Sequence, residues 1–250
     1  MIKIDHLVKT YGTNYAVDDI SFEIKRGEVV GFLGPNGAGK STVMNIITGY
    51  LSSTSGTVTI DGIDVLENPL ATKKMVGYLP EQPPLYLELT VEEYLNFTYE
   101  LKGCTFNREK HLREICDIVK ITDVYKRVIR NLSKGYRQRV GIAQALVGNP
   151  EIIIFDEPTI GLDPKQIIEI RNLIRTLGRD HTVILSTHIL QEVQACCDRI
   201  IIINKGRIVA DELTENISRA VGANRRFNVK ICGPQREVLA MLKSKPGIVY

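Results

Sequence analysis

Several features that would assign a chain to a particular class of protein are missing from this 250-residue sequence. It contains no apolar run near the ~18 residues that a membrane-spanning helix requires, and its first residues are not those of a signal peptide. It has neither internal repeats nor low-complexity segments. The net charge of +3 is too small to indicate binding to nucleic acid or to an acidic membrane surface. We therefore expect any role at a membrane to depend on a partner protein.

The cysteines argue against a secreted, disulfide-bonded protein. There are five, an odd number, and none has the C-x-x-C spacing of redox or metal sites, although Cys196 and Cys197 are adjacent. This pattern favours a reduced protein of the cytosol. The rest of the composition, with 44% hydrophobic and 24% charged residues, is that of an ordinary globular protein with enough apolar side chains for a large core.

One stretch has the spacing G-x-x-x-x-G-K-[ST] of a phosphate-binding P-loop. Its residues are Gly34, Pro35, Asn36, Gly37, Ala38, Gly39, Lys40, Ser41 and Thr42. The glycines let the backbone curl so that its N–H groups approach an anion, while Lys40 would place a positive charge beside phosphates and Ser41 would offer a hydroxyl to Mg²⁺. Residues 29–33 indicate a buried strand and residues 41–48 a helix, which together direct a helix N-terminus at phosphate. The alternative is a glycine turn that arose by chance.

A pair of acids is the second strong signal. Residues 152–155 are bulky and apolar, which indicates a buried strand, and Asp156 and Glu157 follow at its end, where ligands bind in open parallel sheets. Asp156 could hold Mg²⁺ directly or through water, and Glu157 could polarise an attacking water. The alternative is two acids at an ordinary strand-to-loop junction. His188 follows the next predicted strand, residues 182–185.

The remaining patterns predict an α/β core that is interrupted by a helical segment. Apolar periodicity predicts further strands at residues 2–8, 20–25, 57–60, 76–79, 200–203 and 207–210. From about residue 85 to 148 the apolar spacing is helical, and Thr90 with Glu93 has the spacing of a capping box. Pro164 is expected to begin another helix.

The C-terminal residues differ in character from this core. We expect residues 1–212 to form one domain and residues 213–250 to begin a small α+β extension, with a strand at 227–231 and a helix at 236–243. Because the sequence ends at Tyr250 within what reads as an element, we expect this extension to be cut short.

Two further positions could contact a nucleotide. Tyr11 precedes Gly12 ahead of the P-loop, where an aromatic ring could stack on a base; alternatively, it is a loop tyrosine that packs on the sheet. Residues 132–139 open a helix with Ser133 as a suitable N-cap. The N-terminus of this helix, with Gly135, could bind a second phosphate.

Taken in their order along the chain, these motifs resemble those of the ATP-binding cassette (ABC) ATPases over about residues 2–212. The resemblance implies an α/β fold with a RecA-like P-loop NTPase core, an antiparallel β layer and an inserted helical subdomain. It also implies that residues 34–42 are the Walker A loop, which binds ATP, and that Asp156 is the Walker B aspartate. Glu157 would be the catalytic carboxylate and His188 the switch histidine.

The same resemblance assigns residues 161–163 to the D-loop and the Ser133 region to the family signature. The signature contacts the γ-phosphate of ATP that is bound to the other subunit. Ser133 and Gly135 match the usual L-S-G-G-Q, whereas Lys134 and Tyr136 depart from it. Since the serine and the second glycine are present, contact with the γ-phosphate in trans is still expected.

A second departure concerns the loop that usually carries one glutamine, which reads Glu81-Gln82 here. Counted from residues 77–80, Glu81 falls at the family's glutamine position, and Gln82 could serve only if the backbone slips by one residue. Either side chain could join the shell of Mg²⁺ or water through an oxygen. Tyr11 corresponds to the family's adenine-stacking aromatic.

The function that the resemblance implies is that of an ATP-hydrolysing subunit of a membrane transporter. Two copies, or this chain and a paralogue, would enclose two Mg-ATP, and transmembrane permease subunits would hold them at the cytoplasmic side of the membrane. The G-Y-L-P-E and L-S-K-G-Y segments are similar to those of bacterial exporters. The alternative is a soluble ABC ATPase that acts on ribosomes or DNA, although the chain has one cassette and its insertion over 90–147 is short. A regulatory cassette that binds ATP without hydrolysis is disfavoured because Glu157 and His188 are present.

Overall fold

The structure is a computed structural model that describes residues 2–216, 233, 234, 236, 238, 239 and 241. The chain divides into two compact units, Met1–Ile217 and Ser218–Tyr250. The strand predicted at 227–231 lies outside the described residues, and the helix predicted at 236–243 falls only partly within them. The domain boundary after residue 212 stays a prediction.

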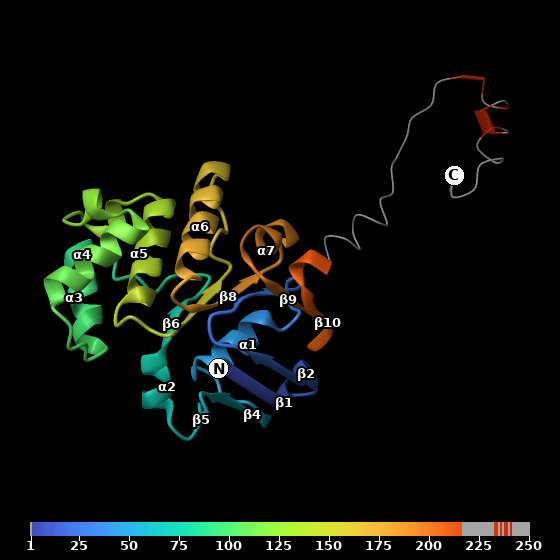
Figure 1. Cartoon of the computed structure of the whole chain (residues 1–250), viewed down its shortest axis with the longest axis horizontal. Coiled ribbons are helices and arrows are strands. Elements are labelled where there is room, and N and C mark those ends of the chain that lie inside the picture. The colour runs from blue at the N-terminus through green and yellow to red at the C-terminus, as the bar shows by residue number, and fades with distance from the viewer. Residues whose placement is uncertain (1, 217–232, 235, 237, 240, 242–250) are drawn as a thin grey trace. The chain divides into compact units, whose positions relative to one another are not determined.

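A six-stranded sheet forms the centre of the first unit (Figure 1), in the order β10-β9-β3-β8-β7-β6. Its strands are β3 (Val29–Leu33), β6 (Val76–Leu79), β7 (Ile152–Asp156), β8 (Thr182–Thr187), β9 (Arg199–Asn204) and β10 (Arg207–Leu213). Neighbouring strands are parallel except for β9 and β10, which form an antiparallel hairpin. Because parallel strands end at the same edge of a sheet, Leu33, Asp156 and Thr187 lie along one edge.

The central strands are buried on both faces, as their continuous apolar runs predict. In β7, Ile153 and Phe155 belong to a core that includes α5 (Lys134–Leu146) and α6 (Pro164–Leu177), whereas Ile152 and Ile154 belong to a core that includes α1 (Lys40–Ile47) and a second sheet. The sheet is therefore the middle layer of the unit.

The second sheet is antiparallel, in the order β2-β1-β4-β5, and is the predicted antiparallel layer. Its strands are β1 (Ile2–Tyr11), β2 (Asn14–Ile24), β4 (Ser55–Ile60) and β5 (Ile63–Asp64). Met44 of α1 is buried in the same cluster as Ile4 and Ile60, so α1 packs between the two sheets. This packing fixes the N-terminus of α1, where the P-loop ends.

Several predicted boundaries were wrong. β1 and β2 are longer than the strands predicted at 2–8 and 20–25, because Tyr11 pairs with Asn14 in a tight hairpin; Tyr11 therefore ends a strand instead of lying in a loop. β8 continues two residues past the predicted 182–185. The helices α2 (Pro69–Met75) and α7 (Leu190–Cys196) were not predicted, since both are short and neither has a side-chain cap.

The helical subdomain contains α3 (Val91–Leu101), α4 (Arg108–Val119) and α5, grouped together in Figure 1. Two 3₁₀ turns, Thr122–Val124 and Ile129–Asn131, connect α4 to α5. The predicted capping box is present: Thr90 Oγ1 accepts from Glu93 N, and Glu93 accepts from Thr90 N. Helix α4 buries one apolar face, formed by Leu112, Ile115, Cys116 and Val119, in keeping with the helical apolar spacing predicted for this segment.

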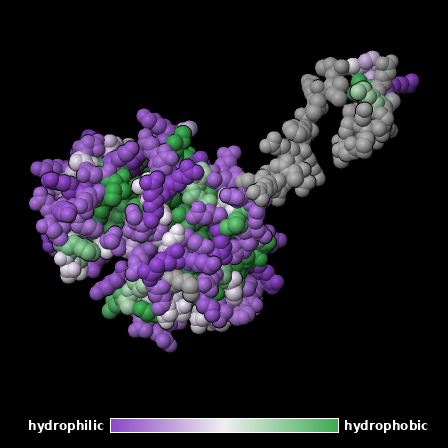
Figure 2. All heavy atoms as spheres, in the orientation of Figure 1, coloured by the Kyte–Doolittle hydropathy of each residue, from purple (hydrophilic) through white to green (hydrophobic). Residues whose placement is uncertain are grey.

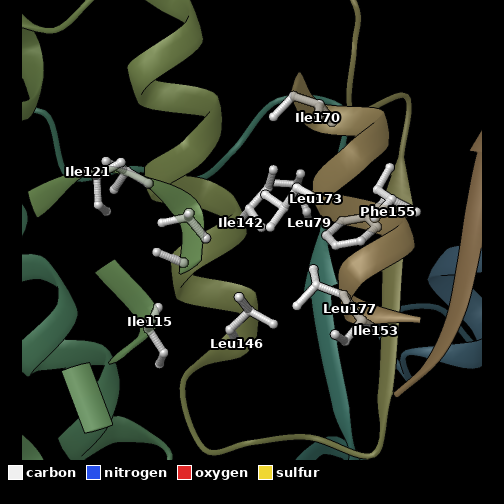
Figure 3. Packing of buried hydrophobic residues seen from close by; sticks show 14 of the residues in the cluster. Leu79, Ile115, Ile121, Ile142, Leu146, Ile153, Phe155, Ile170, Leu173 and Leu177 are labelled. Carbon is white, nitrogen blue, oxygen red and sulfur yellow. The ribbon is translucent and has the colours of Figure 1, made fainter. Parts of the chain in front are cut away.

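Helix α5 attaches this subdomain to the central sheet. Figure 3 shows Ile142 of α5 beside Leu79 of β6 and Leu173 of α6, all in one buried cluster. The backbones of α5 and β6 come so close that a Cβ atom at Gly77 would lie 2.2 Å from the carbonyl oxygen of Ala145. Only glycine fits there, so the joint between the subdomain and the sheet is tightly defined.

Candidate active site at the carboxyl edge of the sheet

The P-loop follows β3 and leads directly into α1. At Gly39 the φ angle is +107°, and a Cβ atom would lie 2.4 Å from the carbonyl oxygen of Ala16. A side chain at this position would both strain the backbone and collide with β2. The tip of the loop, Pro35 to Gly37, is exposed, whereas Lys40 is buried. The loop thus presents its backbone to solvent at the N-terminus of a packed helix, as an anion-binding loop requires.

The Lys40 ammonium points back along this loop. Its Nζ donates to the carbonyl oxygen of Gly34 at 2.7 Å and to that of Pro35 at 3.3 Å. It also lies 3.4 Å from Glu157 Oε1. The cation is therefore held beside the loop and the predicted catalytic carboxylate at the same time.

Glu157 is buried and fixed on several sides. His188 Nδ1 lies 3.0 Å from Glu157 Oε1 and 2.9 Å from Oε2, and Glu157 N donates to the carbonyl oxygen of Ser186. The φ angle of Glu157 is +49°, a strained conformation for a residue with a side chain, which costs about 1–3 kcal/mol. The fold holds this carboxylate in a position that its own backbone preference opposes.

Asp156 supplies an oxygen that fits a cation. The residue is 2% exposed, and its Oδ1 has no hydrogen-bond partner among the residues that the structure describes. Asp156 and Ser41 line the same cavity of about 610 Å³. No group of three or more His, Cys, Asp or Glu in the described part of the chain could hold a metal alone. One carboxylate and one hydroxyl beside a phosphate-binding loop are what Mg²⁺ uses when phosphates complete its shell.

A second cavity, of about 340 Å³, brings most of the predicted residues together. It is lined by Ala16, Asn36, Gly37, Gly39, Lys40, Ser41, Thr42, Glu81, Glu157, Ile160 and His188. Glu81 lines both cavities, whereas Gln82 lines only the larger one. Ala16 and Ile160 were not predicted, and nothing in the sequence distinguishes such apolar residues from ordinary core or loop positions.

The other predicted residues lie outside these two linings. Tyr11 is exposed at the end of β1, with the Lys9 ammonium 5.3 Å from its ring centre. Ser133 caps α5 by accepting from Tyr136 N, and Gly135 is buried. The hydroxyl of Tyr136, which departs from the family signature, donates to Asp123. The structure thus joins the loop, the acids and His188 in one place and keeps the signature segment apart from it.

Comparison with known proteins agrees with this geometry. The family model described as ABC transporter matches residues 17–160, more than half of the chain. The linearmycin resistance ATP-binding protein LnrL of Bacillus subtilis (strain 168) is 33% identical over 246 residues, covering 98% of this chain and 79% of LnrL. The bacitracin transport ATP-binding protein BcrA of Bacillus licheniformis is 36% identical over 213 residues, covering 84% of this chain and 69% of BcrA.

The solved structures give the same result. A dimeric structure of the ATP-binding cassette MJ0796, in a post-hydrolysis state bound to ADP and Pi, is similar to 86% of this chain with a TM-score of 0.78 and 31% identity, and the match covers 99% of that chain. The predicted fold and family are therefore confirmed. Within the described residues, every helix is too short or too polar to cross a bilayer. The chain belongs to the ABC transporter family, as an ATP-binding subunit with ATPase activity.

Proposed function

We propose that this chain hydrolyses Mg-ATP to drive export through a membrane transporter, with Glu157 as the general base. The observation that carries the proposal is the position of Glu157, between the Lys40 ammonium and His188 in the lining of one cavity. A carboxylate there can accept a proton from the water that attacks the γ-phosphate. His188, through Nδ1, holds the carboxylate in that orientation.

Binding of ATP would use the P-loop and its helix. The exposed backbone from Pro35 to Gly37 and the N-terminus of α1 would hold the phosphates, and Lys40 would exchange its contacts with the loop carbonyls for contacts with phosphate oxygens. Ser41 and Asp156 would hold Mg²⁺, with Glu81 favoured over Gln82 for its shell because Glu81 lines both cavities. The metal would neutralise charge on the phosphates. Tyr11 would stack on the adenine.

A complete site requires a second nucleotide-binding subunit, either another copy of this chain or a paralogue. Ser133 and Lys134 are exposed at the N-terminus of α5, outside both cavities of their own chain. This placement supports the proposal that Ser133 and Gly135 contact the γ-phosphate of ATP that is bound to the partner. The similar cassette MJ0796 is dimeric, which supports the same arrangement.

The membrane partner would dock beside the larger cavity. Figure 2 shows a face that is mostly hydrophilic, with hydrophobic side chains in separate patches. Tyr86 and Phe97 are exposed apolar residues with ring centres 5.4 Å apart, and Pro84 nearby lines the cavity. These exposed rings support docking of a short amphipathic segment of a permease subunit, which would place the chain at the cytoplasmic side of the membrane.

Export is the direction that the relatives support, since LnrL is named for linearmycin resistance and BcrA for bacitracin transport. The proposal is tested by affinity purification of the full chain from native membranes. We expect to recover a polytopic membrane protein in complex with the chain. The ATPase activity of this complex in vesicles should depend on Glu157. Recovery of ribosomes or DNA-bound complexes instead would favour the soluble alternative and contradict the proposal.

A further inference from the structure

Glu192 is a buried acid that the proposed reaction does not use. It lies in α7, which packs beside α6 (Figure 1), and it is 1% exposed. It lines neither of the two cavities described above. A carboxylate is costly to bury unless it is bonded and its charge is compensated, so its contacts indicate what it does.

The two oxygens of Glu192 bond to two different segments of the active site. Oε1 accepts from the Thr159 hydroxyl at 2.5 Å, and Oε2 accepts from the Thr187 hydroxyl at 2.8 Å. Thr159 is two residues after Glu157, and Thr187 immediately precedes His188. One side chain therefore connects the loop that carries Glu157 to the strand end that carries His188.

The direction of the second bond is determined by its surroundings. Thr187 Oγ1 accepts from Ile189 N at 3.2 Å, which leaves the hydroxyl proton for Glu192. The Arg171 guanidinium, from α6, lies 3.8 Å from Glu192 Oε1 and compensates its charge. An apolar side chain could fill this place without any of these requirements, so packing alone does not explain a carboxylate here.

We infer that Glu192 is a positioning residue, which sets the separation of Glu157 and His188 by bridging Thr159 and Thr187. Thr159 also accepts, through its carbonyl oxygen, from Leu162 N, so the bridge extends to the 161–163 segment. The inference rests on the roles proposed for Glu157 and His188. We therefore expect the bridge to affect the chemical step and not the binding of ATP. None of the side chains of Glu192, Thr159 and Thr187 lines the cavity of about 340 Å³ that contains the P-loop residues.

The test compares valine and serine at Thr159 and at Thr187, measured as ATPase activity of the full chain in the assembled transporter. Valine keeps the shape of threonine without the hydroxyl, whereas serine keeps the hydroxyl. We expect the valine variants to lower kcat by roughly 10–100-fold with little change in KM, because a small misplacement of catalytic groups has an effect of this size. The serine variants should keep most of the turnover. The opposite order, with valine better than serine, would mean a packing role and would overturn the inference.

A double-mutant cycle between Glu192→Gln and Thr159→Val provides an independent measurement. If the three residues act as a unit, the double variant should be no slower than Glu192→Gln alone, whereas additive losses would refute the bridge. If Glu192→Gln does not fold, the valine and serine variants at Thr159 and Thr187 test the inference by themselves. Glu157→Gln is measured in parallel: normal turnover there would refute the role of Glu157, while a slow Glu157→Gln with unchanged valine variants would refute only the bridge.

Discussion

Lys40 and Glu157 form an ion pair of 3.4 Å between side chains that are each at most 8% exposed. Lys40 begins the helix after β3, and Glu157 directly follows β7, so the parallel sheet is what brings them together. The same carboxylate contacts His188. The group proposed to activate water is thus bonded to the cation that is proposed to hold the phosphates, which suits a reaction in which both must meet one phosphorus atom.

Replacing Lys40 and replacing Glu157 should nevertheless have different effects, the first on ATP binding and the second on hydrolysis. Lys40→Ala removes charge-assisted hydrogen bonds worth about 1.5–3 kcal/mol each, so ATP binding should weaken by at least about 10-fold. Glu157→Gln should bind ATP normally and hydrolyse it at least ~10²-fold more slowly, the usual scale of a general base. Nucleotide titration and steady-state ATPase assays separate the two effects. Lys110→Ala and Glu114→Gln, on the exposed side of α4, are the matched controls, and near-normal turnover in Glu157→Gln would contradict the assignment.

The P-loop, the acids and the capping box could be predicted because each depends on residues close in sequence. Gly39 needs its left-handed backbone, and Thr90 and Glu93 bond within one turn. The helix α7 could not be predicted from the sequence, since it is seven residues long and Ile189 at its N-cap provides no side-chain hydrogen bond. Contacts of Glu192 with Thr159, 33 positions away, depend on the strand order of the sheet, which no local pattern records. Tertiary packing therefore decided what the sequence alone left open.

The exposed segment beside Pro84 is where we expect the membrane partner to dock. Leu87→Asp and Glu88→Lys change exposed side chains close in sequence to Pro84 without touching the phosphate site. We expect transport to fall at least about 10-fold while ATP binding stays normal, because a buried apolar contact and a charge match would both be lost. Transport and ATPase activity are measured together in vesicles. Ile118→Asp, an exposed apolar position on α4, is the control. Crosslinks from the partner that avoid residues 84–88 would refute the docking surface.

Lys102 makes stability depend on pH. Burial lowers the pKa of Lys102 to about 8, although its Nζ donates to the carbonyl oxygen of Val147 at 2.6 Å and approaches two others at the end of α5. Between about pH 8 and 10.5 the unfolded chain keeps this proton and the folded chain releases it, so the contribution of Lys102 to the free energy of unfolding rises with pH.

The expected gain is at most about 3 kcal/mol, because one pKa unit corresponds to about 1.4 kcal/mol and the three carbonyls reduce the effect of burial. Urea denaturation of the full chain at several pH values from 8 to 10.5 measures it, compared with Lys102→Gln. Subtracting the variant removes the contribution of the other titrating groups. Parallel curves for the two proteins would show that Lys102 stays protonated in the fold.

We expect ATP binding to be converted into motion when two subunits close around the nucleotide. One subunit would leave part of the γ-phosphate uncovered, and Ser133 with Gly135 of a partner would complete its shell from the N-terminus of α5. ATP then stabilises the closed pair of subunits. ADP does not, because it lacks the γ-phosphate that Ser133 and Gly135 of the partner would contact. The Glu157→Gln variant with Mg-ATP should therefore form a dimer in solution, or close the assembled transporter, and Mg-ADP should leave it open.

Adding Ser133→Arg should abolish closure while each subunit still binds ATP, because the exposed Ser133 lies outside the cavities of its own chain. Light scattering after size exclusion measures the dimer, repeated on the full complex if the isolated subunit stays monomeric. Ser52→Arg, at an exposed position after α1, controls for the added charge and bulk. Closure that persists with Ser133→Arg would mean that Lys134 and Tyr136 have changed what the signature contacts, since the serine would then be dispensable for sensing the γ-phosphate.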